Sequence, residues 1–501
     1  MRTRRLFLLL LAPLALLAAA PLALAAAAPI TPEAYPGLPE ADASTLLVLV
    51  ADRGTPAYTA AESKANGSTI FVERKLWRGL EKAAELMNET DGLTVLVGIA
   101  GGEYTGQFSS GVWKVPKIES PNGTLKVLGG FNDDFSGRQP FGFPVRLTTV
   151  YGRDGDIFQM TDKSVLNELV VSGLVLDAAP SNAYDARTNS ILKGQSRSYP
   201  LMSFGRATVN RLTVADNIFL NGAHAAVRLT ITPASPEAEV HITNNFFLNN
   251  LLAFETQIYP SKLRTFGKLV VRHNSFVLNW PYNPDQTSSN VSAIELHTDQ
   301  SFAAAAFERN LFAYNPGGVF QHDWPDGDSG ELTIRENLFF LNGALWNQSA
   351  PEAAVVAGKF GTNPRYLVLD LYDVEDDLSA TMSGNVAFDP QIPVVLAPLQ
   401  SVQASGEVQA QPTVMNDVRR MFGGNTDGGT VAIANFAPQM QYDVRMVPLP
   451  RNEDAQPYGV QPAGLYGATP STGERTAAPA PAGDEVREGP RRAVRRSVGG
   501  Q

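Results

Sequence analysis

The chain has 501 residues, a net charge of −10 and no cysteine. The missing thiols exclude disulfides, thiolate nucleophiles and cysteine-ligated metals. The acidic balance excludes a nucleic-acid-binding protein, which needs a basic face. It also disfavours a polyanionic ligand, unless local arginine or lysine residues or a bound cation intervene.

The first 28 residues are predicted to be a secretory signal peptide, because they combine a basic start, a long Leu/Ala run and an Ala-x-Ala exit. Cleavage would leave no membrane span, so the protein is expected to be secreted, or to reside in the periplasm or cell envelope. Arg4 and Arg5 also fit a twin-arginine signal, so both that export route and the general secretory route stay open. Residues 29–44 are rich in Pro and Ala and are interpreted as a leader into the fold.

The next elements alternate between strand and helix patterns. Residues 45–52 are predicted to form a strand. Residues 73–89 are predicted to form a helix, because their apolar residues recur at helical spacing. Residues 93–106 and 125–138 each combine a strand with a Gly-rich turn.

An Asn-x-Phe motif then recurs at a base spacing of about 28 residues, which indicates a repeat architecture. The repeated asparagines, the last in a weaker copy of the motif, are Asn217, Asn245, Asn274, Asn310, Asn337 and Asn385. Each unit has a strand before the Asn, a short Phe-bearing strand and a third strand, such as 225–231, 252–258 and 293–299. Short strands without intervening helices favour a coil of parallel strands, in which each turn stacks on the next.

The repeated motif is predicted to be scaffold. A turn that stacks on copies of itself places like residues above one another, so the Phe rings would stack inside the coil. Each Asn would take a left-handed backbone at a corner, and its amide would bond to the Asn one turn away. The motif therefore indicates the fold and gives almost no information about activity.

In these repeats the chain resembles right-handed parallel β-helix proteins of the pectate-lyase-like superfamily. The helix at 73–89 with the following "VLVGIAGGEYTGQF" is similar to the entry of such proteins, and "YGVQPAGLYG" (458–467) is similar to their exit. The resemblance implies an all-β fold over residues 45–467: a right-handed parallel β-helix of three-sheet rungs with an N-terminal capping helix. Residues 468–501 have almost no large apolar side chains and are predicted to be disordered.

The resemblance leaves the activity open, because the superfamily includes lyases, hydrolases, epimerases and adhesins. "GNTDGG" contains Asn425, Thr426 and Asp427, which match the first polygalacturonase motif. The further motifs of those enzymes do not follow, and inverting hydrolysis needs a second carboxylate. We interpret the match as chance. The motifs of pectate lyases and mannuronan epimerases are also missing from the sequence.

Candidate site residues lie on the third strand of each unit. Side chains alternate along a strand, so if Val227, Phe254 and Ile294 point inward, then Arg228, Glu255 and Glu295 point outward. Stacked turns lie about 4.8 Å apart, which makes Glu255 and Glu295 candidates for a catalytic carboxylate pair. His297 is a third catalytic candidate, and Arg228 is a candidate for substrate binding. The alternative is an ordinary solvated face.

Two loops add further candidates. An inserted loop at 279–292 offers Trp280 and Tyr282, whose flat rings are suited to stacking on sugars. A second loop carries oxygen ligands for Ca²⁺, although a plain acidic turn has the same composition. These candidate ligands are Asp323, Asp326, Asp328 and Glu331.

These features predict a secreted, monomeric protein that binds a polysaccharide or cell-surface glycan on an outer face of the coil. If it also cleaves that glycan, it would be a polysaccharide lyase or a glycoside hydrolase, with Ca²⁺ as the candidate cofactor. The alternative is a non-catalytic surface, structural or adhesin-like protein.

Overall fold

The structure is a computed structural model. It describes residues 35, 37–106, 113–148, 156–178, 184–185, 190–191, 199–222, 224–250, 252–256, 266–277, 279, 293–296, 302–315, 319–322, 331–340, 342, 357–359, 367–368, 381–392, 450 and 452–461. The predicted signal peptide and the predicted disordered tail lie outside these residues.

Three sheets account for nearly all of the described strands, and they are built from parallel pairs apart from one antiparallel pair at the end of sheet 3. Sheet 1 contains β2 (Ile70–Glu73), β1 (Thr45–Val50), β3 (Thr94–Ala100), β6 (Glu119–Phe131), β9 (Val165–Ser172), β15 (Arg211–Ala215), β19 (Glu239–Thr243), β22 (Phe266–Arg272), β25 (Phe302–Glu308), β28 (Glu331–Arg335) and β32 (Thr381–Ser383), with β14 (Ala207–Val209) and β18 (Ile231–Pro233) at its side. Sheet 2 contains β4 (Gly102–Thr105), β7 (Val145–Thr148), β10 (Leu174–Asp177), β16 (Ile218–Leu220), β20 (Phe246–Leu248), β23 (Ser275–Val277), β26 (Leu311–Ala313) and β29 (Leu338–Phe340). Sheet 3 contains β5 (Trp113–Val115), β8 (Phe158–Met160), β13 (Met202–Ser203), β17 (Ala225–Arg228), β21 (Leu252–Thr256), β24 (Ile294–Leu296), β27 (Phe320–His322), β30 (Ala357–Lys359) and β31 (Leu367–Val368). A small antiparallel pair, β11 (Tyr184–Asp185) and β12 (Ser190–Ile191), stands apart.

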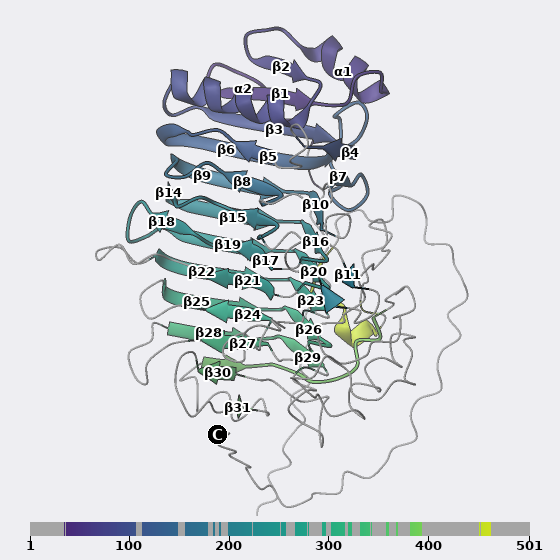
Figure 1. Ribbon diagram of the computed structural model, residues 1–501, viewed down its shortest axis with the longest axis vertical. Helices are drawn as coiled ribbons and strands as arrows, with labels where there is room; N and C mark the ends of the chain where they lie inside the picture. Colours follow the sequence, from purple (N-terminus) through teal and green to yellow (C-terminus); the bar gives the residue numbers. More distant parts are fainter. Residues whose placement is uncertain are drawn as a thin grey trace, which may run out of the picture.

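The chain visits the three sheets in turn. Strands β15, β16 and β17 lie in sheets 1, 2 and 3, and β19, β20 and β21 repeat that route one layer further on. We call one such passage a rung. Figure 1 shows the rungs lying one below another along the long axis of the molecule. This mostly-β arrangement of parallel sheets is consistent with a parallel β-helix.

The repeated Phe residues form a stack inside the molecule, as the sequence predicts. Rings from consecutive rungs lie nearly parallel, with centroids 4.9 Å apart for Phe219–Phe247, Phe247–Phe276 and Phe276–Phe312. Phe339 continues the stack at 5.1 Å. All of these rings are fully buried in the main core, so each rung buries apolar surface against the next.

The repeated Asn residues form a ladder beside this stack, and the predicted amide bonding is confirmed. The Nδ2 of Asn217 donates to Oδ1 of Asn245 at 3.0 Å, and the Asn245–Asn274 step has the same length. The bonding continues through Asn310, Asn337 and Asn385. Each Nδ2 also donates to a backbone carbonyl, such as Val171 for Asn217. These buried amides therefore have their hydrogen-bonding capacity met.

The expectation that these asparagines adopt a left-handed backbone is wrong. The left-handed residue is the one before each Asn: Asp216, Asn244, His273, Arg309 and Glu336 have φ values between 52° and 57°. This residue turns the chain from sheet 1 to sheet 2. The following Asn is buried on the inner side of the corner, where its amide reaches the next rung. The two roles, turning and bonding, are thus divided between two neighbouring residues.

A second ladder, absent from the sequence prediction, stands five residues further along each rung, where sheet 2 gives way to sheet 3. Asn250 donates to Asn279 at 3.1 Å, Asn279 to Asn315 at 3.3 Å, and Asn315 to Asn342 at 2.8 Å. In the first rung the backbone N–H of Gly222 donates to Asn250 instead. The three-residue strands of sheet 2 are therefore held at both ends.

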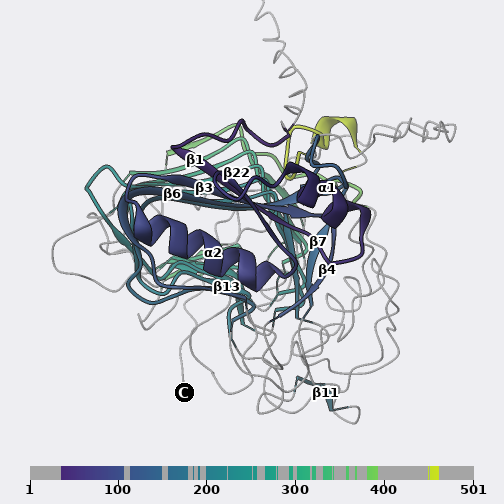
Figure 2. The same cartoon turned by 90° about the horizontal axis from the view of Figure 1, so that it is seen from above.

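Helix α2 (Leu76–Glu89) confirms the predicted helix, which begins three residues later than expected. Its buried face, including Leu80, Ala83 and Met87, joins the main core. Figures 1 and 2 show α2 lying across the end of the stack. A shorter helix, α1 (Pro56–Lys64), packs outside sheet 1. No helix in the described part of the chain is long and apolar enough to span a bilayer.

The three sheets differ in what covers their outer faces. The outward residues of sheet 2, such as Ile218 and Phe246, are apolar and buried. A C-terminal segment with the short helix η5 (Glu453–Ala455) packs on them through Ala455, Tyr458 and Val460. The backbone N–H of Val460 donates to Ser275 Oγ at 2.9 Å. Sheet 2 is thus committed to packing, whereas sheet 3 turns a column of polar residues outward.

Candidate binding site on sheet 3

One register position of sheet 3 carries a polar residue on each of seven successive rungs. The strands pair so that these residues form a single line, which we call the sheet 3 column: Lys114, Gln159, Ser203, Arg228, Glu255, Glu295 and Gln321. The residue before each member is apolar. Val227, Phe254 and Ile294 belong to the main core, as the predicted alternation requires of the inward positions.

Arg228 and Glu255 form an ion pair at the centre of the column, between Arg228 Nε and Glu255 Oε1. The Arg228 side chain is 26% exposed and the Glu255 side chain only 7%. An outward-facing carboxylate is therefore almost fully removed from water. A buried carboxylate is costly unless it is paired, and the guanidinium of Arg228 supplies that pairing from the adjacent rung.

His224 extends this pair on the other side of the guanidinium. Its Nε2 lies 3.1 Å from an Arg228 terminal nitrogen, and its Nδ1 accepts the backbone N–H of Ala225 at 2.6 Å. His224 immediately precedes β17 (Ala225–Arg228). The three side chains His224, Arg228 and Glu255 thus form one connected chain across two rungs.

Ser203 and Asp156 form a second buried pair two rungs before Glu255. The Ser203 hydroxyl donates to Asp156 Oδ2, and the two residues are 5% and 7% exposed. Neither residue, nor His224, is predicted as a site residue from the sequence. Asp156 and Ser203 precede the first Asn-x-Phe copy, so the motif that revealed the later rungs gave no register for these.

The column can hydrogen-bond a ligand along its length. It offers carboxylate acceptors, guanidinium and amide donors, and a hydroxyl that does both. Successive members are about 4.8 Å apart along the stack, the usual spacing between neighbouring strands. Glu255 and Glu295 are paired in register, which places their backbones at the separation that a carboxylate pair of about 5 Å requires.

Most of the other predicted site residues cannot be placed relative to this column. His297, Trp280, Tyr282, Asp323, Asp326 and Asp328 lie outside the described residues. Glu331 is described: it is the exposed first residue of β28 in sheet 1, paired with Ala304. Within the described part of the chain, no group of three or more acidic or histidine side chains has the geometry to hold a metal ion.

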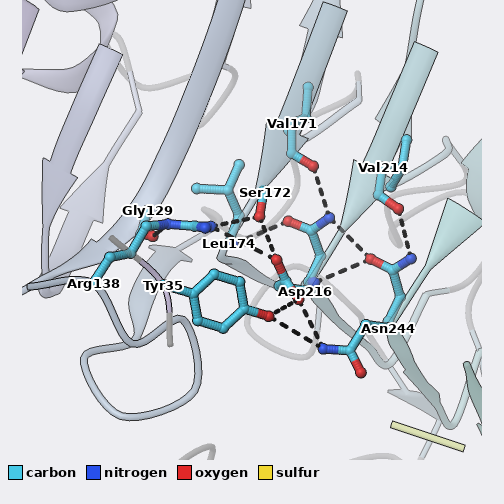
Figure 3. A network of polar contacts seen from close by, with 11 residues as sticks. Tyr35, Gly129, Arg138, Val171, Ser172, Leu174, Val214, Asp216 and Asn244 are labelled. Carbon is cyan, nitrogen blue, oxygen red and sulfur yellow. Dashed lines mark hydrogen bonds and ion pairs between the residues drawn. The ribbon is translucent and has the colours of Figure 1, made fainter. Parts of the chain in front are cut away.

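A further buried polar network lies at the corner between sheets 1 and 2 (Figure 3). Asp216 accepts from the Tyr35 hydroxyl, from Ser172 Oγ at 2.8 Å and from Asn244 Nδ2 at 2.7 Å. Arg138 stands 3.9 Å from Asp216 and also donates to Ser172 and to the carbonyl of Gly129. Burial lowers the pKa of Arg138 and, together with Asp216, raises the pKa of Tyr35.

This corner network is structural. Its hydrogen bonds connect Tyr35 of the leader to Ser172, Asp216 and Asn244, which lie on three successive rungs. Asn244 also accepts the backbone N–H of Gln461 through Oδ1 at 2.5 Å, so it holds the C-terminal segment as well. One corner below, burial and the nearby Arg272 and Arg309 lower the pKa of His273 to about 4.

Comparison of the chain with protein-family models, with curated proteins and with solved structures gave no match.

Proposed function

We propose that the chain is a secreted right-handed parallel β-helix of the pectate-lyase-like type, with α2 as its capping helix. We propose further that it binds a polysaccharide or cell-surface glycan along the sheet 3 column. The fold proposal is supported by the three parallel sheets, the stacked Phe rings and the two asparagine ladders.

The observation that carries the functional proposal is the buried Arg228–Glu255 pair on an outward face. Such a pair contributes little to stability, because the cost of removing two charges from water offsets their attraction. The scaffold does not require it either, since the same register position holds Gln159 and Ser203 on other rungs. A charged pair kept at this cost is better explained by recognition of a ligand.

A polysaccharide suits the shape of this site. The column runs along the stack from rung to rung, so it would present hydrogen-bonding groups to a linear polymer at regular intervals. Sugar hydroxyls both donate and accept hydrogen bonds, as do Ser203 and Gln159. In this proposal Trp280 and Tyr282 would stack on sugar rings, and Asp323, Asp326, Asp328 and Glu331 would hold Ca²⁺ if the ligand needs it.

In the catalytic version of this proposal, the protein also cleaves the glycan that it binds. The register of Glu255 with Glu295 favours a carboxylate pair, which serves a glycoside hydrolase as acid and as base or nucleophile. His297 would act beside them. One observation favours the non-catalytic alternative instead: Glu255 is buried and already engaged by Arg228. A carboxylate held in that way suits an adhesin or structural protein whose column only binds.

A binding and digestion panel tests the proposal. The purified protein is run in native gels containing neutral or uronic polysaccharides, and is incubated with the same polymers in Ca²⁺ or in a chelator. Gel retardation with new reducing ends indicates a hydrolase, and unsaturated uronate indicates a lyase. Retardation without product supports the non-catalytic alternative. Neither retardation nor product across the panel would show the proposal to be wrong.

Glu295→Gln separates catalysis from binding. If Glu295 acts as an acid or base, this variant loses product formation by about 10²-fold or more, while its thermal unfolding midpoint stays unchanged. Glu89→Gln, at the exposed end of α2, is the matched control and keeps full activity. Equal activity of the two variants would remove Glu295 from the catalytic proposal.

A further inference from the structure

We infer that the C-terminal segment, residues 452–461, is a latch that acid opens, and that His273 beneath it is the group that responds to pH. This latch is independent of the proposed glycan binding, because it lies at the corner between sheets 1 and 2 and on the outer face of sheet 2.

The segment is seated tightly across three successive rungs. Its last three residues each donate a backbone N–H to a different rung: Gly459 to the carbonyl of Arg309 at 2.9 Å, Val460 to Ser275 Oγ at 2.9 Å, and Gln461 to Asn244 Oδ1 at 2.5 Å. Gly459 has a φ of 73°, and an added Cβ would lie 2.5 Å from Ser275 Oγ and 2.9 Å from Leu311 Cβ. The segment therefore leaves no room for a side chain where it crosses the corner.

His273 contacts the segment from the middle of these rungs. Its ring hydrogen-bonds the backbone of Gly459. Its Nδ1 is buried and has no hydrogen-bond partner in the described structure, so the bond to Gly459 is made through Nε2. A neutral ring fits this site. A second proton, on Nδ1, would create a buried donor with nothing to accept it, which is costly.

The charges around the ring also oppose a second proton. Burial, followed by the positive charges of Arg272 and Arg309, lowers the pKa of His273 to about 4. Glu336 acts in the opposite direction, but its carboxylate is already paired with Arg309. The other charged or titratable groups on the elements that meet here are Asp216, Glu308, Arg335, Glu453, Asp454 and Tyr458.

Opening of the latch removes this conflict. When the segment lifts, the ring of His273 reaches water, where the pKa of histidine is about 6.5. The open form therefore takes up a proton first as the pH falls, and acid shifts the equilibrium toward it. A pKa that changes from 6.5 to about 4 on closing favours opening by up to about 60-fold between pH 7 and pH 4.5. Opening would uncover apolar residues of sheet 2 under the segment, such as Leu311.

Hydrogen–deuterium exchange with mass spectrometry tests the latch in the full-length protein. Exchange of peptides that cover residues 452–461 and strand β19 is measured at pH 7 and at pH 4.5, and is corrected for the intrinsic rate at each pH. The protection factor of the segment is expected to fall about tenfold or more at pH 4.5, while that of β19 changes less than about threefold. Unchanged protection of the segment would overturn the inference. An equal fall in β19 would also overturn it, because the whole stack would then be opening.

His273→Asn removes the titrating ring and keeps every carboxylate. Asparagine already holds the left-handed backbone one rung earlier, at Asn244, so the corner should stay folded. The protection factor of the segment in this variant should change less than about threefold between the two pH values. His241→Asn, which removes a histidine paired with Glu239 on sheet 1, is the matched control and should keep the full acid response. An equal fall in the two variants would assign the response to other groups and overturn the inference.

Arg272→Gln tests the contribution of the neighbouring charge. Removing this cation makes protonation of His273 in the closed form less costly, so the fall in protection at pH 4.5 should be smaller than in the unmodified protein. A full acid response in a folded Arg272→Gln variant would contradict the electrostatic basis of the latch.

Discussion

The asparagine ladder and the sheet 3 column run along the same stack and follow opposite rules. At the ladder position the residue is identical from rung to rung, as in Asn245, Asn274 and Asn310. At the column position it changes at nearly every rung, as in Ser203, Arg228 and Glu255. Repetition at a fixed register therefore marks what the fold needs, and under the proposed function the varied positions of the column are those that contact the ligand.

The chemistry of each group explains the difference. An amide carries a donor and an acceptor, so each Asn donates to the next and accepts from the one before. Identical charges placed at one strand spacing would repel each other. The outer face of sheet 1 shows how the fold avoids this, since Arg211 pairs with Glu239 at 3.4 Å and Arg335 with Glu308 at 2.7 Å. Charged residues on stacked rungs of sheet 1 pair by alternating in sign, whereas amides can repeat.

The largest loss of stability is expected from breaking the ladder. Asn274→Ala removes the acceptor for Asn245 and a donor to Asn310 and to the carbonyl of Ile242. Each buried polar group left unsatisfied costs about 1–3 kcal/mol, so the free energy of unfolding should fall by about 4 kcal/mol. Denaturation in guanidinium chloride measures this. Thr213→Ala, on the outer face of sheet 1, is the control and should change it by less than about 0.5 kcal/mol.

A smaller loss of stability and a larger loss of binding are expected at the column. Arg228→Gln leaves Glu255 buried without its cation, and should cost about 2–3 kcal/mol because Arg228 is partly exposed. Glycan binding should be abolished. The double variant Arg228→Gln/Glu255→Gln should recover part of the stability without recovering glycan binding. If Asn274→Ala impaired binding as much as Arg228→Gln does, at a temperature where both are folded, the distinction between ladder and column would fail.

The corner position of His273 makes stability depend on pH. Its pKa falls from 6.5 to about 4 in the folded protein, through burial and the nearby Arg272 and Arg309. Below pH 6.5 the unfolded chain takes up the proton first, so this contribution is complete above pH 6.5 and is lost as the pH falls toward 4. Between pH 7 and pH 4.5 the loss should be about 2 kcal/mol.

The pH prediction is checked by the unfolding midpoint at pH 7 and at pH 4.5. His273→Asn keeps a residue that tolerates the left-handed backbone and removes the titrating group. This variant should therefore lose less stability between the two pH values than the unmodified protein does. An equal loss in both proteins would assign the acid sensitivity to other groups.

The smallest effect is expected where the leader meets the corner network. Tyr35→Phe removes only the hydroxyl that donates to Asp216, and should lower the free energy of unfolding by about 1 kcal/mol. Glycan binding should be unchanged, because Tyr35 lies outside the sheet 3 column. Affinity electrophoresis and denaturant unfolding on the same preparation test both halves of this prediction.

The sequence allowed the repeating features to be predicted, because like residues recur at a nearly fixed spacing. The Phe stack, the bonding of Asn217 through Asn385 and the register of Arg228 with Glu255 all follow from that spacing. The second ladder was also accessible, since Asn250, Asn279 and Asn315 each stand five residues after a recognised Asn. Its first position holds Gly222, which has no side-chain amide and interrupts the pattern.

Other features had no repeating signal. Asp156 and Ser203 precede the first copy of the motif, so their pairing depends on rungs whose register the sequence does not display. The left-handed residues Asp216, His273 and Arg309 share a backbone conformation and no side-chain chemistry. Tyr35 and Gln461 meet Asn244 across separations of 209 and 217 residues, and no local pattern predicts such contacts.

The contacts of Tyr35 and Gln461 with Asn244 constrain the order of folding. Neighbouring rungs pair over separations such as 28 residues, so the stack can grow locally as the chain is made. Tyr35 must wait for Asp216, 181 residues later, and Gln461 follows after every described rung. Contacts of such long range close late because of the entropy of the intervening loops. The hydrogen bonds at Asn244 are therefore expected to form last. A chain that stops short of residue 461 would lack the bond from Gln461 and keep only those to Tyr35 and Asp216.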